Sequence, residues 1–104
     1  MDKKKLSALL GIAQKAGKIV SGEFAVEQAV RNKKARFVLV AEDASENSKK
    51  NYRDLTGYYG VPCYEVLSKE EIGESIGKPH RAALAVTDQG FCQALTKLLP
   101  PESR

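Results

Sequence analysis

The sequence has no tryptophan, one histidine and two cysteines among its 104 residues. Aromatic residues make up only 7% of the chain, which leaves few rings on which single-stranded bases stack. A single histidine, His80, does not make a metal site without further ligands, and the sequence has no clustered Cys/His pattern. These shortages argue against a metal centre and predict no cofactor.

The two cysteines, Cys63 and Cys92, stand far apart and form no CxxC pair. A chain of this length folds without disulfides, so we interpret both as reduced thiols of the core. The alternative is a redox pair or a nucleophile, which requires basic groups nearby that the sequence alone does not place.

Long apolar runs are missing as well. No stretch approaches the roughly 18 apolar residues that suggest a membrane-spanning helix. The N-terminal segment MDKKKLSALLGIAQKAGK returns to polar residues after one short apolar stretch, so we expect no secretory signal and a cytoplasmic protein without membrane contact. Lys and Arg number 17 against 13 Asp and Glu, and the net charge of +4 favours contact with phosphate backbones. Length and a 42% hydrophobic content predict one domain over residues 1–104.

Apolar spacing alternates between helical and extended patterns along the first half of the chain. Four residues at helical spacing predict a helix that ends near Ala16, before the stop Gly17. After an extended piece at 19–20, Ser21 is expected to cap a second helix that runs to about Asn32. The apolar run FVLVA at 37–41 indicates a strand buried on both faces.

The second half repeats this alternation. A basic amphipathic helix is predicted over 46–59 and closes at Gly60, before a short strand at 63–66. Ser68 and Glu71 have the spacing of a capping box that opens a helix ending at Gly77. A strand at 82–86 and a helix capped by Asp88 follow, and the last four residues form a polar tail. The pattern predicts an α/β fold, a three-layer α/β/α sandwich with a small mixed, mostly parallel sheet.

Phosphate-binding and catalytic motifs are absent: the sequence contains no GxGxxG, GxxxxGK[ST], GxSxG or HExxH. Glu42 and Asp43 follow the central strand, where α/β enzymes place catalytic acids. Adjacent carboxylates in AEDAS can equally begin a helix, and no His or Lys partner is identifiable for acid or base chemistry. We therefore predict a protein that is not an enzyme.

Basic residues near element ends, and two loops, suggest RNA contacts. The SGEF segment at 21–24 presents free amides at a helix start, and Phe24 lies off the apolar helix face. Phe24 either stacks on a base or covers a neighbouring element. In GKPHRAA at 77–83, His80 and Arg81 either reach an RNA groove or phosphate, or form an ordinary solvated connection.

The segments SGEFAVEQAVRNKKARFVLVAEDAS, VPCYEVLSKEEIGESIGKP and AALAVTD together resemble the L-seven-Ae ribosomal-protein family, most closely its bacterial members. The resemblance covers nearly the whole chain. It implies a kink-turn RNA-binding fold without catalysis, with ribosomal or other kink-turn RNA, and possible contact with the ribosome, as its partner class.

Family members read the sheared G·A pairs of a kink-turn through a Gly-x-Asn-Glu-x-x-Lys segment. Gly22 matches its glycine, whereas Phe24, Ala25 and Gln28 replace its Asn, Glu and Lys, so most base-reading side chains are absent here. Lys69 matches a basic family position, and the 78–82 loop matches one that packs against a flipped-out nucleotide. That loop is apolar in archaeal and eukaryotic relatives, so His80 and Arg81 suggest a more electrostatic, salt-sensitive contact.

The leading hypothesis is a non-catalytic RNA-binding protein that recognises kink-turn or similarly structured RNA. The alternative is a protein-interaction module on the same fold, with Phe24 and Ala25 forming an apolar patch. The predicted RNA-binding residues are Ser21, Gly22, Glu23, Phe24, Gln28, Arg31, Lys69, Lys78, Pro79, His80, Arg81 and Ala82.

Overall fold

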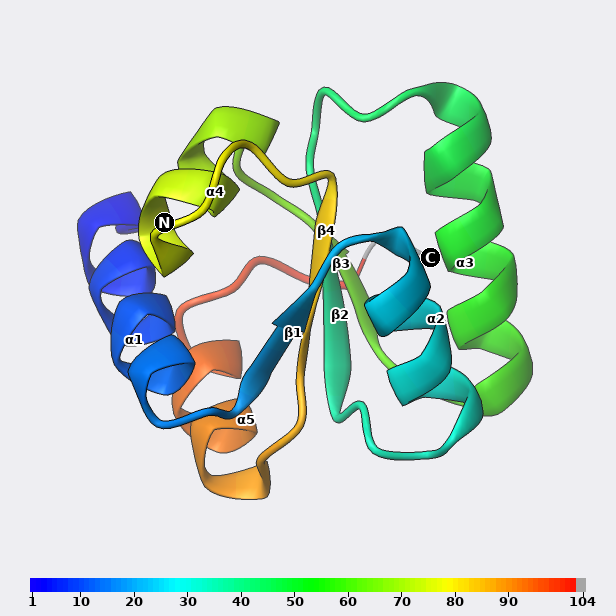
Figure 1. Cartoon of the computed structure of the whole chain (residues 1–104), viewed down its shortest axis with the longest axis horizontal. Coiled ribbons are helices and arrows are strands. Elements are labelled where there is room, and N and C mark those ends of the chain that lie inside the picture. Colours follow the sequence, from blue (N-terminus) through cyan, green and yellow to red (C-terminus); the bar gives the residue numbers. More distant parts are fainter. Residues whose placement is uncertain (103–104) are drawn as a thin grey trace.

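The computed structural model describes residues 1–102 and has three layers (Figure 1). In chain order the elements are α1 (Lys3–Lys15), β1 (Ile19–Ser21), α2 (Glu23–Arg31), β2 (Phe37–Val40), α3 (Glu46–Tyr59), β3 (Cys63–Glu65), α4 (Lys69–Ile76), β4 (Ala83–Val86) and α5 (Gln89–Thr96). Helices α1, α4 and α5 cover one face of the sheet, and α2 and α3 cover the other. The predicted α/β/α sandwich is thus confirmed.

The sheet is mixed, as predicted, but it is not mostly parallel. Its strand order is β1-β4-β2-β3, and only β2 and β3 pair in parallel. Strands β1, β2 and β3 run in one direction, as the alternation of strands and helices implies. Strand β4 runs the other way and lies between β1 and β2, so both of its pairings are antiparallel. Because of this insertion, β4 starts at the edge of the sheet where the other three strands end.

Both faces of the central strands are buried. All four residues of β2 and all four of β4 are buried, which explains their continuous apolar sequences. Leu6, Leu10 and Ala13 of α1 pack into one side of this core with no exposed surface. The ring of Phe37 meets that of Tyr64 edge to face, with 5.6 Å between the centroids.

Most predicted helix ends are confirmed. Gly17, Gly60 and Gly77 all have left-handed φ values, between 68° and 73°. The capping box of Ser68 and Glu71 is formed in both directions. Helix α5 begins after its predicted cap, Asp88, and ends before Leu98, which packs partly buried against the core.

Two further sequence predictions have mixed outcomes. Cys63 is buried in the core, but Cys92 is only partly buried, and burial raises the pKa of its thiol. The C-terminal tail is described to residue 102, and the rest of the predicted polar tail lies outside the described residues. Within residues 1–102, no helix is both long enough and apolar enough to cross a membrane.

Candidate nucleic-acid interface

One edge of the sheet gathers most of the candidate residues. Ser21 at the end of β1 pairs with Leu84, and Val40 at the end of β2 pairs with Ala83 and with Glu65 at the end of β3. The start of α2, the start of α4 and the 77–82 connection all meet at this edge. We call the surface formed by Gly22, Phe24, Lys69 and residues 79–82 the loop edge.

Arg81 holds the loop edge together. Its backbone amide donates to the carbonyl oxygen of Lys69 at 3.1 Å, which fastens the connection to the start of α4. Its Nε donates to Ser21 Oγ at 3.3 Å, and its Nη1 donates to the carbonyl oxygens of Pro79 and His80 at 3.4 and 3.3 Å. Part of the hydrogen-bonding capacity of the guanidinium is therefore used within the protein, so Arg81 positions the loop in addition to carrying charge.

The start of α2 differs from the prediction at its cap. Ser21 does not cap this helix, because it belongs to β1 and its hydroxyl accepts from Arg81. Gly22 is the N-cap, with φ of 92° and no side-chain hydrogen bond to the first turn. This φ strongly favours glycine, and a cap without a side chain leaves the first amides of α2 accessible to a ligand. The expectation of free amides at SGEF agrees with this geometry.

Phe24 projects from the first turn of α2 with 75% of its surface exposed. The sequence left two interpretations of Phe24, a ring that stacks on a base and a ring that covers a neighbouring element. The structure excludes the second, because the ring faces outward. Glu23, its neighbour, is also exposed, and its carboxylate acts electrostatically on Tyr52 of the adjacent α3. Burial, followed by the carboxylates of Glu23 and Glu27, raises the pKa of Tyr52 to about 12.

The start of α4 is fixed from two sides. In the capping box, the Ser68 amide donates to Glu71 Oε1 at 2.8 Å, which lowers the pKa of Glu71 together with the charge of Lys3. Asp43 Oδ1 accepts from the Lys69 amide at 2.8 Å. Asp43 is thus used at the start of α4, although the sequence suggested either catalysis or the start of the next helix in the chain. Glu42 and Asp43 are both exposed.

Gly73 lets the 77–82 connection lie against α4. A Cβ built on this buried glycine would come within 2.5 Å of the Pro79 carbonyl oxygen and 2.8 Å of His80 Cα. The loop backbone therefore packs directly against the backbone of α4 at Gly73. On either side it is held by the Lys78 amide, which donates to the Gly73 carbonyl oxygen at 2.9 Å, and by the Arg81 amide.

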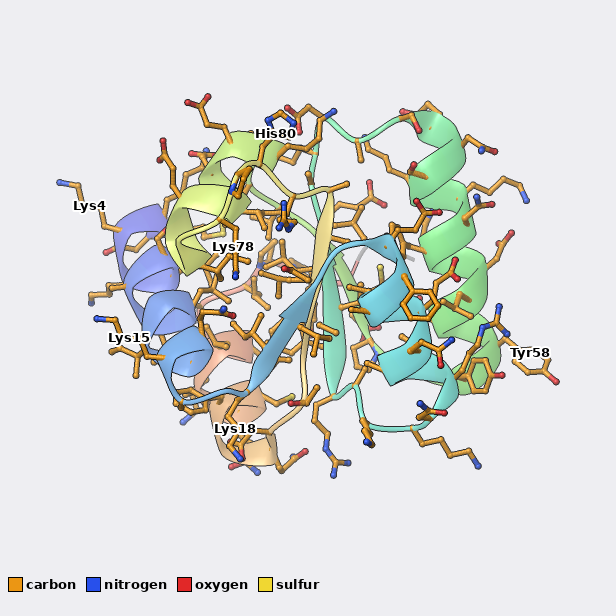
Figure 2. The ribbon with its side chains drawn as sticks, in the orientation of Figure 1. Lys4, Lys15, Lys18, Tyr58, Lys78 and His80 are labelled. Carbon is orange, nitrogen blue, oxygen red and sulfur yellow. The ribbon has the colours of Figure 1, made fainter. Side chains whose placement is uncertain are left out.

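Other candidate residues lie farther from this edge. Gln28 and Arg31 are exposed on the later turns of α2, and Arg31 is about 12 Å along the helix axis from Glu23. Arg31 lines a groove between α2 and α3 together with Tyr58 and Tyr59. Figure 2 shows His80 at the loop edge and Lys78 nearer the middle of the α1 and α4 side. The structure thus brings together Ser21 to Phe24, Lys69 and residues 79–82.

Sequence reasoning missed two residues that build this surface, Gly73 and Asp43. A glycine inside a helical pattern often has a packing reason, and that signal was present at Gly73. Asp43 gave no comparable signal, because its partner amide is 26 residues away in the chain. Among residues 1–102, no group of His, Cys, Asp or Glu side chains has an arrangement that could hold a metal ion.

Comparison with known proteins agrees with the sequence resemblance. The model of the ribosomal protein L7Ae/L30e/S12e/Gadd45 family matches residues 4–96. An RNA-binding protein YlxQ of Enterococcus faecium is 43% identical over 98 residues, which span 94% of each chain. An RNA-binding protein YlxQ of Bacillus subtilis (strain 168) is 50% identical over 91 residues, covering 88% of this chain and 91% of the relative.

Among solved structures, a protein of unknown function from Bacillus halodurans C is similar with a TM-score of 0.87 and 35% identity. The match covers 90% of this chain and 95% of that one, so the fold is shared over nearly its whole length. The family model, the two sequence relatives and the shared fold agree, and the chain belongs to the ribosomal protein L7Ae/L30e/S12e/Gadd45 family.

Proposed function

We propose that this protein binds structured RNA of the kink-turn type at the loop edge and catalyses no reaction. The observation that carries the proposal is the convergence of the Gly22 cap, Lys69 and the 79–82 backbone at one edge of the sheet. Two curated relatives that match at least 88% of this chain are named RNA-binding proteins, which supports the class of ligand.

The loop edge suits a folded RNA better than a flexible strand. Its segments are tied to one another by the Arg81, Lys69 and Asp43 hydrogen bonds, so little conformational entropy remains to be lost on binding. Folded RNA is recognised largely by shape, by its phosphates and by bases that turn out of the stack. The accessible amides after Gly22 and the charge of Lys69 can meet phosphates, and the exposed ring of Phe24 can stack on an unpaired base.

Discrimination of the kink is expected to be weaker than in relatives that keep the full reading motif. Phe24, Ala25 and Gln28 cannot supply the contacts of the Asn, Glu and Lys that the family motif places there. By analogy with DNA readout, each lost base-edge contact costs roughly 1 to 3 kcal/mol of discrimination. Charge then makes a larger share of the affinity, which should fall steeply with added salt.

The direct test is a titration of the protein against a kink-turn RNA and a straight duplex of equal length, at several salt concentrations. We expect the kinked RNA to bind at least about tenfold more tightly, a preference worth roughly 1.4 kcal/mol. Arg81→Ala should reduce this preference, because the 79–82 connection loses its tie to Ser21. Equal affinity of the wild-type protein for both RNAs would contradict the proposal.

We further propose that ribosomal RNA is the class of target and that the protein acts in the cytoplasm. The family name supports this assignment, since the matching model is that of a ribosomal-protein family. Sedimentation of a cell lysate through a sucrose gradient should place part of the wild-type protein with ribosomal particles, and Arg81→Ala should move it to the top fractions. Wild-type protein found entirely at the top would contradict this assignment.

A second candidate function rests on Phe24 and its neighbour Ala25. A ring that is 75% exposed is also a typical anchor for a protein partner, and the partly buried Ala25 beside it adds apolar surface. This alternative predicts a protein complex that tolerates high salt, is lost in Phe24→Asp and is unchanged in Arg81→Ala. Loss of the complex in both variants, or its loss in high salt, would instead favour RNA.

A further inference from the structure

A second basic surface lies outside the loop edge, on α1 and the groove beside it. Lys4 and Lys15 are separated by three helical turns, about 16 Å, and therefore lie on the same side of α1. Lys18 follows α1 and Lys78 follows α4, and all four lysines are exposed. Figure 2 shows the four on one half of the molecule, opposite Tyr58. We call these four residues the α1 basic face.

The groove next to these lysines has a floor of small residues. It lies between α1 and α4 and encloses about 560 Å³. Ala8 and Gly11 lie between Lys4 and Lys15 on the helix, and a Cβ on Gly11 would come within 3.1 Å of the Ser75 carbonyl oxygen. The two helices therefore pack closely at Gly11, and the small residues of the groove leave room for the backbone of a bound ligand. Glu74 is the one acid among the residues that line this groove.

The charges at the start of α1 conflict with the helix dipole. Lys3, Lys4 and Lys5 form the first turn, where the partial positive charge of the helix disfavours cations, and the N-cap carboxylate of Asp2, which accepts from the Lys5 amide at 3.1 Å, offsets part of this charge. Lys3 also forms an ion pair that offsets part of the positive charge at this helix end, with its Nζ 3.4 Å from Glu71 Oε2. No ion pair is formed by Lys4 or Lys5 within residues 1–102. A polyanion bound along α1 would compensate these charges.

The two lysines of α3 are arranged differently. On α3, Lys49 pairs with Glu46 and Glu65, and Lys50 pairs with Asp54 at 2.9 Å. The α3 lysines thus have acidic partners in the protein, whereas Lys4 and Lys15 leave their charge to solvent or to a ligand. The α1 basic face is therefore better suited to an external anion than the α3 surface is.

The α1 basic face lies beside the loop edge. The ion pair between Lys3 and Glu71 fixes the start of α1 beside the first turn of α4, and that turn carries Lys69. The same turn carries the acids Glu70 and Glu71, so the lysines of α1 form a separate positive stretch next to Lys69. The stem of an RNA held at the loop edge would pass close to the lysines of α1.

We propose that the α1 basic face binds the phosphate backbone of an RNA duplex, next to the segment held at the loop edge. The inference rests on the proposed RNA-binding function and extends it to a second contact surface. Such a contact reads charge and helical shape without sequence, so it should add affinity equally for kinked and straight RNA.

The test compares two variants that lose the same charge. Lys4→Gln/Lys15→Gln removes two lysines of the α1 basic face. Lys34→Gln/Lys50→Gln removes two exposed lysines that lie outside the α1 basic face, one between α2 and β2 and one on α3. Each variant is titrated with a kink-turn RNA carrying a long stem and with a straight duplex of equal length, at several salt concentrations. Circular dichroism melting confirms that both variants fold.

We expect Lys4→Gln/Lys15→Gln to weaken binding to both RNAs by on the order of tenfold near physiological salt. The slope of log affinity against log salt should become shallower by about two, close to one per lost phosphate contact. The ratio of kinked to straight affinity should not change. Lys34→Gln/Lys50→Gln should bind both RNAs nearly as the wild type does.

The outcomes separate this inference from the proposed function. If Lys4→Gln/Lys15→Gln binds both RNAs as tightly as the control variant, the α1 basic face is not a contact surface, and the inference is wrong even where the wild type prefers the kinked RNA. If the wild type shows no such preference, the loop-edge proposal fails, while the loss of duplex affinity in Lys4→Gln/Lys15→Gln still supports the second surface.

Discussion

Gly73→Ala should disturb the loop edge without removing any side chain that faces it. The Cβ of the new alanine would lie 2.5 Å from the Pro79 carbonyl oxygen and 2.8 Å from both Pro79 C and His80 Cα. Ordinary contacts between such atoms begin near 3.4 Å, so the loop backbone must move by roughly 1 Å. Because all three atoms belong to the backbone, no side-chain rotation relieves the clash.

The 77–82 connection cannot move freely, because it is held on both sides of the clash. The Lys78 amide donates to Gly73 itself, and the Arg81 amide donates to Lys69. Overpacking of this kind costs about 1 to 3 kcal/mol. Against it stands the higher helix propensity of alanine, worth about 1 kcal/mol in a helix interior. We expect a net loss of roughly 1 kcal/mol, which lowers the melting temperature by about 4 to 8 °C for a domain of this size.

Binding is expected to suffer together with stability. A displacement of about 1 Å at Pro79 and His80 moves the loop away from the geometry that the proposed kink-turn contact requires. The preference for kinked over straight RNA should fall several-fold, as measured by titration at a temperature where the variant is fully folded.

Gly11→Ala is a matched control. Its Cβ would meet the Ser75 carbonyl oxygen at 3.1 Å, a milder contact between α1 and α4 that lies away from the loop edge. This variant should keep the preference for kinked RNA. A Gly73→Ala protein that melts at or above the wild-type temperature and keeps its full preference would refute the reasoning, since helix propensity would then be the only effect present.

Three further predictions concern one or two side chains each. Asp43→Ala should lower the free energy of unfolding by about 1 kcal/mol, because the Lys69 amide loses its acceptor, whereas Asp43→Asn keeps an acceptor and should lose less; urea unfolding measures both. Tyr52 has a pKa of about 12 in the fold against a reference value of 10.0, so the fold binds this proton more tightly than the unfolded chain does. Stability should therefore hold below pH 10 and fall between pH 10 and pH 12, by up to about 3 kcal/mol, and Tyr52→Phe should remove this component of the alkaline unfolding curve. Phe24→Asn/Gln28→Lys, which restores two positions of the family motif, should raise the preference for kinked over straight RNA; an unchanged ratio would show that these positions do not reach the bases.

Local chemistry made several features of the fold predictable. The left-handed φ at Gly60 and Gly77, the capping box at Ser68 and the cap at Asp88 all depend on residues within four positions of one another. Such features follow from short-range sterics and hydrogen bonding, which a sequence displays directly. The layers followed in the same way from the alternation of helices and strands.

The position of β4 depends on long-range pairing instead. FVLV in β2 and ALAV in β4 are both fully buried, and an apolar run is the same whichever direction its strand takes. The direction of β4 is set by the 77–82 connection, which returns over α4 at Gly73 to the edge where β1 and β2 end. The contacts of Arg81 with Ser21 and of Asp43 with Lys69 depend on this return, so the candidate residues were predictable while their arrangement was not.

If the loop edge recognises the kink and the α1 basic face binds any duplex, the ratio of kinked to straight affinity should depend only weakly on salt. The α1 basic face would act on any duplex, so its phosphate contacts cancel in the ratio of kinked to straight affinity. At the loop edge, Arg81 already shares its guanidinium with Ser21 and the loop carbonyls, which leaves Lys69 as the main charge available there. The ratio should therefore fall with salt by a slope of only about one, while each separate affinity falls more steeply. A ratio that falls as steeply as the affinities themselves would mean that charge at the loop edge, and not its shape, selects the kinked RNA.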